Sequence, residues 1–179
     1  MMYLLDFDHT LMDTEALKGA AKADGSEVLV GTPAFWQYHT VMDFLFPDVL
    51  PWLKSKPKES LHILTAYKPS QGPQAKAFQE AKLRSGGFAD LVASVTVVEG
   101  MKGEWAVQRA KRYQPSQPVS FIDDRPDQCA SVKAALPDAC CFLMVRYQVC
   151  PAIVPPGVIP VYSLMEVDTE LARSAVGAL

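Results

Sequence analysis

Short apolar runs alternate along this chain with segments whose apolar residues recur at the spacing of a helix. The runs predict strands at residues 2–7, 60–66, 94–98, 118–123 and 140–146, with the sequences "MYLLDF", "SLHILTA", "SVTVV", "PVSFID" and "CCFLMVR". Nearly continuous apolar runs are typical of parallel strands that are buried on both faces. Because these strands alternate with helical segments, we expect a three-layer α/β domain with a mainly parallel central sheet.

Helical patterns occupy most of the segments between these runs. Thr32 and Pro33 have the order expected where a helix begins, and Gly86 and Gly87 follow the last turn of another helix. The predicted helices cover residues 13–23, 33–55 with an interruption at Pro47, 73–85, 103–113, 126–135 and 164–175.

Two segments depart from the alternation. Residues 147–161, "YQVCPAIVPPGVIPV", contain four prolines and little periodicity, so we expect an extended connection before the last helix. Residues 12–44 have no strong strand signal and are predicted to form a small helical insert, or cap, after the first strand. We expect the insert to be part of a single domain that spans residues 1–179.

The composition is that of a globular protein without a strong electrostatic bias. Apolar residues make up 49% of the 179 residues, and the formal net charge is -3. A general affinity for nucleic acid is therefore not supported, although a local basic patch remains compatible with the sequence. The start "MMYLLDFD" lacks the features of a signal peptide, and no apolar segment approaches the roughly 18 residues of a membrane span. We predict a cytoplasmic protein with no membrane partner.

The cysteines fit this location. The chain has four of them, and no two form a CxxC pair. Cys140 and Cys141 lie in the apolar run "ACCFLMV", where a buried strand would hide both. We expect reduced, structural thiols at Cys129, Cys140, Cys141 and Cys150.

The first apolar run ends in two carboxylates. In "DFDHT", Asp6 and Asp8 are two positions apart, and such residues of an extended segment face the same side. Their charges would repel one another, so this sequence predicts a compensating partner. The simplest alternative is that both are ordinary turn residues.

A second acidic group, "VSFIDDRPDQ", repeats this arrangement at the end of another apolar run. The carboxyl ends of parallel strands meet at one edge of a sheet, so Asp123 and Asp124 would lie near Asp6 and Asp8. A hard divalent cation such as Mg²⁺ would neutralise such a cluster and keep sites open for a phosphate. The alternative for Asp123, Asp124 and Asp127 is capping of the helix that follows.

Two further polar residues occupy positions from which they could reach the same edge. Thr65 ends the run "LHILTA" and offers a hydroxyl donor, and Lys102 stands just before a predicted helix and offers an ammonium. Taken alone, each residue has a simpler explanation, because a threonine at a strand end often bonds locally and a lysine at a helix start is often solvated.

The order of these residues is more informative than any one of them. DxDxT is followed by a strand ending in threonine, then by a lysine, then by a strand ending in two aspartates. Over residues 3–146 this order resembles the haloacid dehalogenase (HAD) superfamily of phosphohydrolases, with motifs at "DFDHT", Thr65, Lys102 and "IDDRPDQ". The resemblance implies a Rossmann-like (HAD-like) fold whose central strand, 2–7, lies between the strands ending at Thr65 and Asp124.

The resemblance also implies a mechanism. Asp6 would attack phosphorus to form an aspartyl-phosphate, and Asp8 would protonate the leaving oxygen and later take a proton from water. Thr65 and Lys102 would hold the transferring oxygens. Family dehalogenases do not need an acid at the position of Asp8, whereas phosphatases do, so phosphate-ester chemistry is favoured.

The implied cofactor is Mg²⁺. By the resemblance it would be held by the Asp6 carboxylate, the Asp8 backbone carbonyl and the Asp124 side chain. Asp123 is a further candidate that would act through water. A common form of the family has glycine where Asp123 stands and a second acidic residue where Gln128 stands.

Other positions around the motifs allow more than one role. His9 stands where the family often has glycine. Arg125 could contact a substrate phosphate, although a surface ion pair explains it as well. Phe35, Trp36 and Tyr38 could stack on a base or sugar, or could pack the insert onto the domain.

The insert at 12–44 makes only a small cap, so the crevice would be comparatively open. It would admit a bulky phosphorylated partner, or a neighbouring subunit would close it over a small substrate. We expect a Mg²⁺-dependent phosphatase acting on a phosphorylated substrate, most simply a small molecule. The alternatives are a nucleotidase or nucleic-acid-end phosphatase, and a catalytically silent HAD-like binding module.

Overall fold

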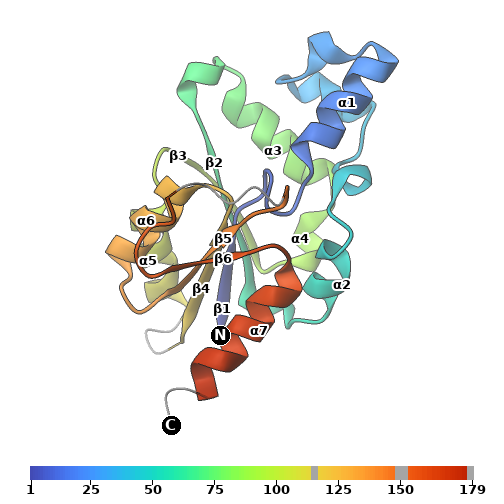
Figure 1. The fold of residues 1–179 in the computed structure, drawn as a ribbon. Coiled ribbons are helices and arrows are strands. Elements are labelled where there is room, and N and C mark those ends of the chain that lie inside the picture. The colour runs from blue at the N-terminus through green and yellow to red at the C-terminus, as the bar shows by residue number, and fades with distance from the viewer. Residues whose placement is uncertain (114–116, 148–152, 177–179) are drawn as a thin grey trace.

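The chain folds around one six-stranded sheet, in which every neighbouring pair of strands is parallel (Figure 1). The computed structural model describes residues 1–113, 117–147 and 153–176, without the side chains of residues 175 and 176. The strand order is β3-β2-β1-β4-β5-β6. The strands are β1 (Met2–Leu5), β2 (Leu61–Tyr67), β3 (Ser94–Glu99), β4 (Val119–Asp123), β5 (Cys140–Met144) and β6 (Val158–Val161).

All five predicted strands are present, and β1 lies between β2 and β4 as expected. The sixth strand, β6, was missed because we predicted only an extended connection there. It is short, carries Pro160, and pairs with β5 at the edge of the sheet. Proline is tolerated at a sheet edge, where a missing N–H donor breaks no ladder.

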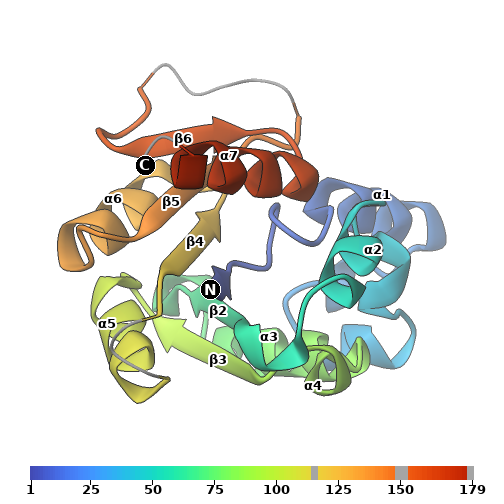
Figure 2. The same cartoon turned by 90° about the horizontal axis from the view of Figure 1, so that it is seen from below.

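The helices cover both faces of the sheet. Figure 2 shows α5 and α6 on one face and α2, α4 and α7 on the other. Tyr3 and Leu5 of β1 pack in one apolar cluster, and Met2 and Leu4 pack in the other, so β1 is buried on both sides. The helices are α1 (Thr14–Asp24), α2 (Val49–Lys54), α3 (Ala75–Ser85), α4 (Phe88–Leu91), α5 (Gly103–Arg112), α6 (Pro126–Ala135) and α7 (Leu164–Val176).

The helix predicted over residues 33–55, with its interruption at Pro47, is confirmed only after the interruption, as the α-helix α2. The chain there forms two 3₁₀ turns, Pro33–Gln37 and Val41–Phe44, followed by the short α2. Thr40 has an extended backbone and its hydroxyl accepts a hydrogen bond from the Met42 N–H, which starts a new turn. Local side-chain bonds of this kind compete with a continuous helix.

The insert after β1 consists of α1 and three 3₁₀ turns, and it packs beside α3 (Figure 1). Phe35 and Trp36 are buried, and the Trp36 ring lies 5.6 Å from the Phe78 ring of α3. These two aromatic residues therefore pack the insert onto the domain and are not available to stack on a ligand. Tyr38 is exposed. Whether the insert acts as a cap stays a prediction.

Three of the four cysteines lie in the described residues, and all three are free thiols. Cys129 and Cys141 are buried, whereas Cys140 is half-buried. Cys150 lies outside the described residues. Among the described helices, none has both the length and the apolar character needed to cross a membrane.

Candidate active site

A tight turn directly after β1 presents the first two carboxylates. Asp6 is fixed to β4 by its backbone N–H, which donates to the Ile122 carbonyl at 2.8 Å. His9 has a φ of 56°, in the left-handed region that suits glycine. This conformation explains why glycine is common at the corresponding position of the HAD family, and it shows that the turn forms here with histidine.

The two acidic clusters converge as the sequence predicted. Carboxylate oxygens of Asp6, Asp123 and Asp124 all lie within 4.8 Å of one another. Asp6 and Asp123 are buried, and Asp124 is half-buried. The carboxylate of Asp8 is not part of this cluster. The Asp8 carbonyl as a metal ligand stays a prediction.

Lys102 lies between two of these carboxylates. It is 1% exposed, its Nζ contacts the Asp6 carboxylate, and it donates to Asp123 Oδ2 at 2.6 Å. Burial alone would lower the pKa of this ammonium, but the carboxylates of Asp123 and Asp6 outweigh burial and raise the pKa above its ordinary value. Lys102 is therefore a fixed positive charge beside the predicted nucleophile.

One ammonium does not balance three carboxylates. Burial, together with the charges of Asp6 and Asp123, raises the pKa of Asp124 to about 8. Burial and the Asp6 charge also raise the pKa of Asp123, to about 7, against the opposing effect of Lys102. Burial is the larger cause of both shifts and the neighbouring carboxylates add to it, and a bound cation would oppose both effects.

The oxygen ligands that these residues offer fit a magnesium ion. Hard carboxylate and carbonyl oxygens are the ligands that Mg²⁺ takes in proteins, and it usually needs only one or two carboxylates. Both oxygens of Asp123 already accept hydrogen bonds, from Lys102 and from the Arg125 N–H at 2.9 Å. Both oxygens of Asp6 also accept hydrogen bonds, from Lys102 and Thr10, whereas Asp124 accepts none from the residues that the structure describes, so Asp124 is the carboxylate best placed to bind a metal.

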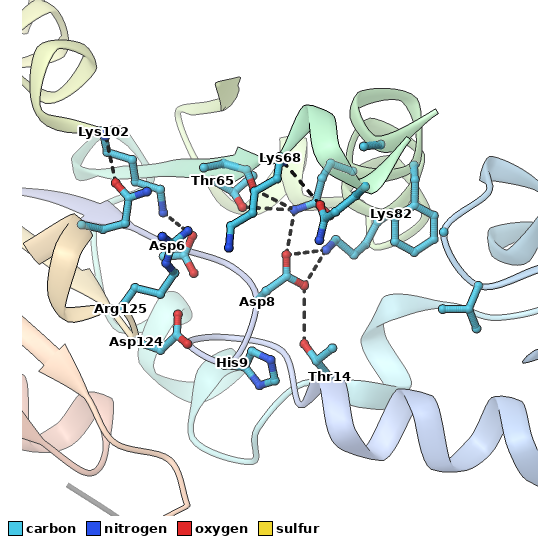
Figure 3. Close-up of a pocket in the computed structure, with 18 of the residues that line it drawn as sticks. Asp6, Asp8, His9, Thr14, Thr65, Lys68, Lys82, Lys102, Asp124 and Arg125 are labelled. Carbon is cyan, nitrogen blue, oxygen red and sulfur yellow. Dashed lines mark hydrogen bonds and ion pairs between the residues drawn. The ribbon is translucent and has the colours of Figure 1, made fainter. Parts of the chain in front are cut away.

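A cavity of about 430 Å³ opens beside the cluster. Its lining includes five of the six predicted site residues, namely Asp6, Asp8, Thr65, Lys102 and Asp124 (Figure 3). The sixth, Asp123, is fully buried and does not line the cavity. Thr65 is buried at the carboxyl end of β2. The opposite walls come from α3 and from the insert, through Phe78, Thr14, Lys18 and Val30.

Asp8 has partners that the sequence analysis missed. Lys82 Nζ donates to its two oxygens at 2.5 and 2.7 Å, and Gln79 Nε2 donates to one of them at 2.7 Å (Figure 3). Burial would raise the pKa of Asp8, but the charge and hydrogen bond of Lys82 lower it below the usual value. The available signal was the pattern of α3, where Gln79 and Lys82 share the buried face with Ala75 and Leu83.

The neighbours of Asp124 have structural roles. Arg125 forms an ion pair with Asp127, which was the simpler of its two predicted roles. Arg125 also lines the cavity. The Gln128 side chain accepts from the Lys102 N–H at 2.9 Å and donates to the Gly100 carbonyl at 3.1 Å. Gln128 therefore fixes the loop that carries Lys102, where the family often has an acidic residue.

Similarity to known proteins is found in structure and not in sequence. No family model matches this chain, and no curated protein is detectably similar to it. A crystal structure of a proposed haloacid dehalogenase-like hydrolase from Burkholderia xenovorans LB400 superposes with a TM-score of 0.67 at 18% identity, covering 94% of this chain and 96% of that one. The fold of this chain is that of the haloacid dehalogenase-like hydrolases.

Two further structures have the same fold. The proposed HAD-hydrolase YfnB from Bacillus subtilis, bound to magnesium, superposes with a TM-score of 0.62 at 14% identity, covering 95% of this chain and 97% of that one. The L-2-haloacid dehalogenase from Xanthobacter autotrophicus, with chloropropionic acid covalently bound, gives 0.60 at 12% identity, covering 96% and 99%. The fold thus occurs with magnesium in one protein and with a dehalogenase activity in another.

Proposed function

We propose that this protein is a Mg²⁺-dependent phosphatase that hydrolyses a phosphate monoester through an aspartyl-phosphate on Asp6. The observation that supports this most is the convergence of Asp6, Asp123 and Asp124 beside Lys102 at one end of a cavity. This arrangement combines a nucleophile, oxygen ligands for a cation, and a positive charge for the transferring phosphoryl oxygens.

The side chains divide the reaction between them. An Asp6 oxygen forms a bond to phosphorus as the ester oxygen leaves, and Asp8 supplies the proton that this oxygen takes up. Water then attacks phosphorus, Asp8 accepts its proton, and the bond to Asp6 breaks to release phosphate. Lys102 and Thr65 hold the phosphoryl oxygens in line. A bound Mg²⁺ would supply charge neutralisation, held by Asp6, Asp124 and the Asp8 carbonyl.

Phosphate-ester hydrolysis is favoured over dehalogenation because of Asp8. A halide leaves without a proton, so an acid beside the nucleophile would have no task in a dehalogenase. Asp8 lines the same cavity as Asp6 and is hydrogen-bonded to three side chains, those of Lys82, Gln79 and Thr14. These hydrogen bonds fix the Asp8 carboxylate in the cavity, which supports a role of Asp8 in proton transfer.

A small phosphorylated molecule fits the cavity better than a macromolecule. A volume of about 430 Å³ is in the usual range for small-molecule sites. The insert supplies part of the cavity wall, through Thr14, Lys18 and Val30. The nucleotidase alternative loses its support from Phe35 and Trp36, which are buried in packing. Oligomerisation and a cytoplasmic location stay predictions from the sequence.

Hydrolysis of 4-nitrophenyl phosphate tests the proposal. We expect turnover with Mg²⁺, its loss with EDTA, and a fall of at least about 10⁴-fold in kcat for Asp6→Asn, because the nucleophile is gone. Asp90→Asn, an exposed aspartate on α4, is the matched control and should retain full activity. If Mg²⁺ binds but neither this ester nor a panel of phosphorylated metabolites and nucleotides is hydrolysed, the protein is a silent binding module.

A further inference from the structure

The strongest feature that the proposed mechanism does not use is the buried ammonium of Lys82. The residue is 2% exposed, and its Nζ lies 5.5 Å from the Phe7 ring and 5.7 Å from the Phe78 ring. Burying a charged lysine is costly unless the charge is paired. Its partner is Asp8, at 2.5 and 2.7 Å from the two carboxylate oxygens, so the aromatic rings and the ion pair together fix both groups.

A second residue of α3 holds the same carboxylate. Gln79, about one turn before Lys82, donates to Asp8 Oδ2 at 2.7 Å and lies 3.4 Å from the Thr65 hydroxyl. Thr14, at the start of α1, lies 3.5 Å from Asp8 Oδ1. The Asp8 carboxylate is therefore held on the side of the cavity formed by α3 and the insert, away from the carboxylates of Asp123 and Asp124 (Figure 3).

The two buried lysines of the cavity serve different carboxylates. Lys102 contacts Asp6 and Asp123, whereas Lys82 contacts Asp8. We propose that Lys82 is a positioning residue, which holds Asp8 where it can give a proton to the leaving oxygen and later take one from the attacking water. The inference rests on the proposed function, because it assigns Lys82 a task only if Asp8 is the acid and base.

The position of Asp8 also indicates where the leaving group lies. A general acid must be within hydrogen-bond reach of the oxygen that it protonates. With Asp8 held against α3, the leaving group would occupy the part of the cavity beside α3, near Gln79 and Phe78. Lys82 would thus contribute to rate through Asp8, with little effect on how tightly the phosphate group binds.

Lys82→Met tests this role. Methionine is a flexible apolar side chain that can fill the space between Phe7 and Phe78, so the packing is largely kept. We compare 4-nitrophenyl phosphate, whose leaving group needs little protonation, with phenyl phosphate, whose leaving group needs more. General acid-base catalysis contributes about 10²–10⁴-fold, so losing its alignment should lower kcat/KM for phenyl phosphate by about 10–100-fold.

The expected result is a selective loss. The kcat/KM for phenyl phosphate should fall at least several times more than that for 4-nitrophenyl phosphate, because kcat/KM covers phosphoryl transfer and not the later attack by water, which is the same step for both esters. Lys76→Met, an exposed lysine on the same helix, should leave both rates unchanged. If Lys82→Met does not fold by circular dichroism, Gln79→Met removes the second α3 contact to Asp8 and should give the same selective loss.

Three results would overturn the inference while the proposed function stands. An equal fall in kcat/KM for both esters would indicate a general structural role, and unchanged values would indicate none. A rise in KM without a fall in kcat would place the ammonium on the substrate. The proposed function fails in a different way, by absence of Mg²⁺-dependent turnover in the unaltered protein.

Discussion

Asp6 and Asp8 are separated by one residue, yet their carboxylates belong to different environments. Asp6 lies among carboxylates and beside Lys102, whereas Asp8 is hydrogen-bonded to Lys82 and Gln79. The tight turn at His9 and the packing of α3 keep the two groups apart. The repulsion expected from the sequence is therefore relieved on the Asp8 side by α3 and, in our proposal, on the Asp6 side by a cation.

Asp124→Asn should weaken Mg²⁺ binding without lowering the stability of the fold. Burial and the charges of Asp6 and Asp123 raise the pKa of Asp124, so a neutral amide relieves repulsion, and the thermal midpoint in EDTA should be unchanged or higher. Half-maximal activity should need at least about tenfold more Mg²⁺. Mg²⁺ titration of activity and thermal unfolding in EDTA measure both. An unchanged Mg²⁺ requirement would remove Asp124 from the predicted metal ligands.

At this scale the sequence predicted the residues that end strands. Asp6, Asp8, Thr65 and Asp124 could be placed together because parallel strands end at a common edge. Lys82 could not, because it is 74 positions from Asp8 and contacts it only through the packing of α3. The one local sign that Lys82 has a buried partner was its position among the buried residues of α3.

At the scale of elements, one ion pair joins four segments around the motif turn. Arg146, after β5, donates to both oxygens of Asp48 at 2.9 Å and to the Thr10 carbonyl at 2.9 Å. Asp48, just before α2, also accepts from the Leu164 N–H at the start of α7, at 2.8 Å. The Arg146 side chain is 5% exposed, so the cost of burying its positive charge is compensated by the Asp48 carboxylate.

Asp48→Ala should therefore destabilise the fold strongly. Removing one partner of a buried ion pair leaves an unpaired charge, and the free energy of unfolding should fall by about 3–5 kcal/mol. Asp43→Ala, an exposed residue of the preceding 3₁₀ turn, should change it by less than about 0.5 kcal/mol. Urea unfolding measures both variants. Similar small losses in the two variants would show that Asp48 contributes little to the fold.

The elements that sequence reasoning predicted poorly are the short ones. Strands β1, β2, β4 and β5 stand out as apolar runs because both of their faces are buried, whereas the edge strand β3 is mostly half-buried or exposed and is recognised by its β-branched residues. The 3₁₀ turns between Pro33 and Phe44 bury Phe35, Trp36, Val41 and Phe44 without a helical period, so their residues resemble an interrupted helix. β6 is short and contains proline, which disguises an edge strand as a connection.

For the whole molecule, alternation of strands and helices was enough to predict the layers and the edge that carries the site. It was not enough to predict the cavity. The cavity walls come from the insert and α3, whose packing depends on contacts such as that between Trp36 and Phe78. The chemistry at the strand ends could therefore be predicted before the identity of the substrate, which depends on those walls.

The central claim, a covalent phosphoryl group on Asp6, is tested most directly by mass spectrometry of Asp8→Asn mixed with 4-nitrophenyl phosphate and Mg²⁺. Nitrophenolate leaves without a proton, whereas attack by water needs the base, so the intermediate should accumulate. We predict one phosphoryl group on the peptide that contains Asp6, absent when Asp6→Asn is added. Turnover by the unaltered protein, with no phosphoryl group on that peptide in Asp8→Asn, would contradict the account.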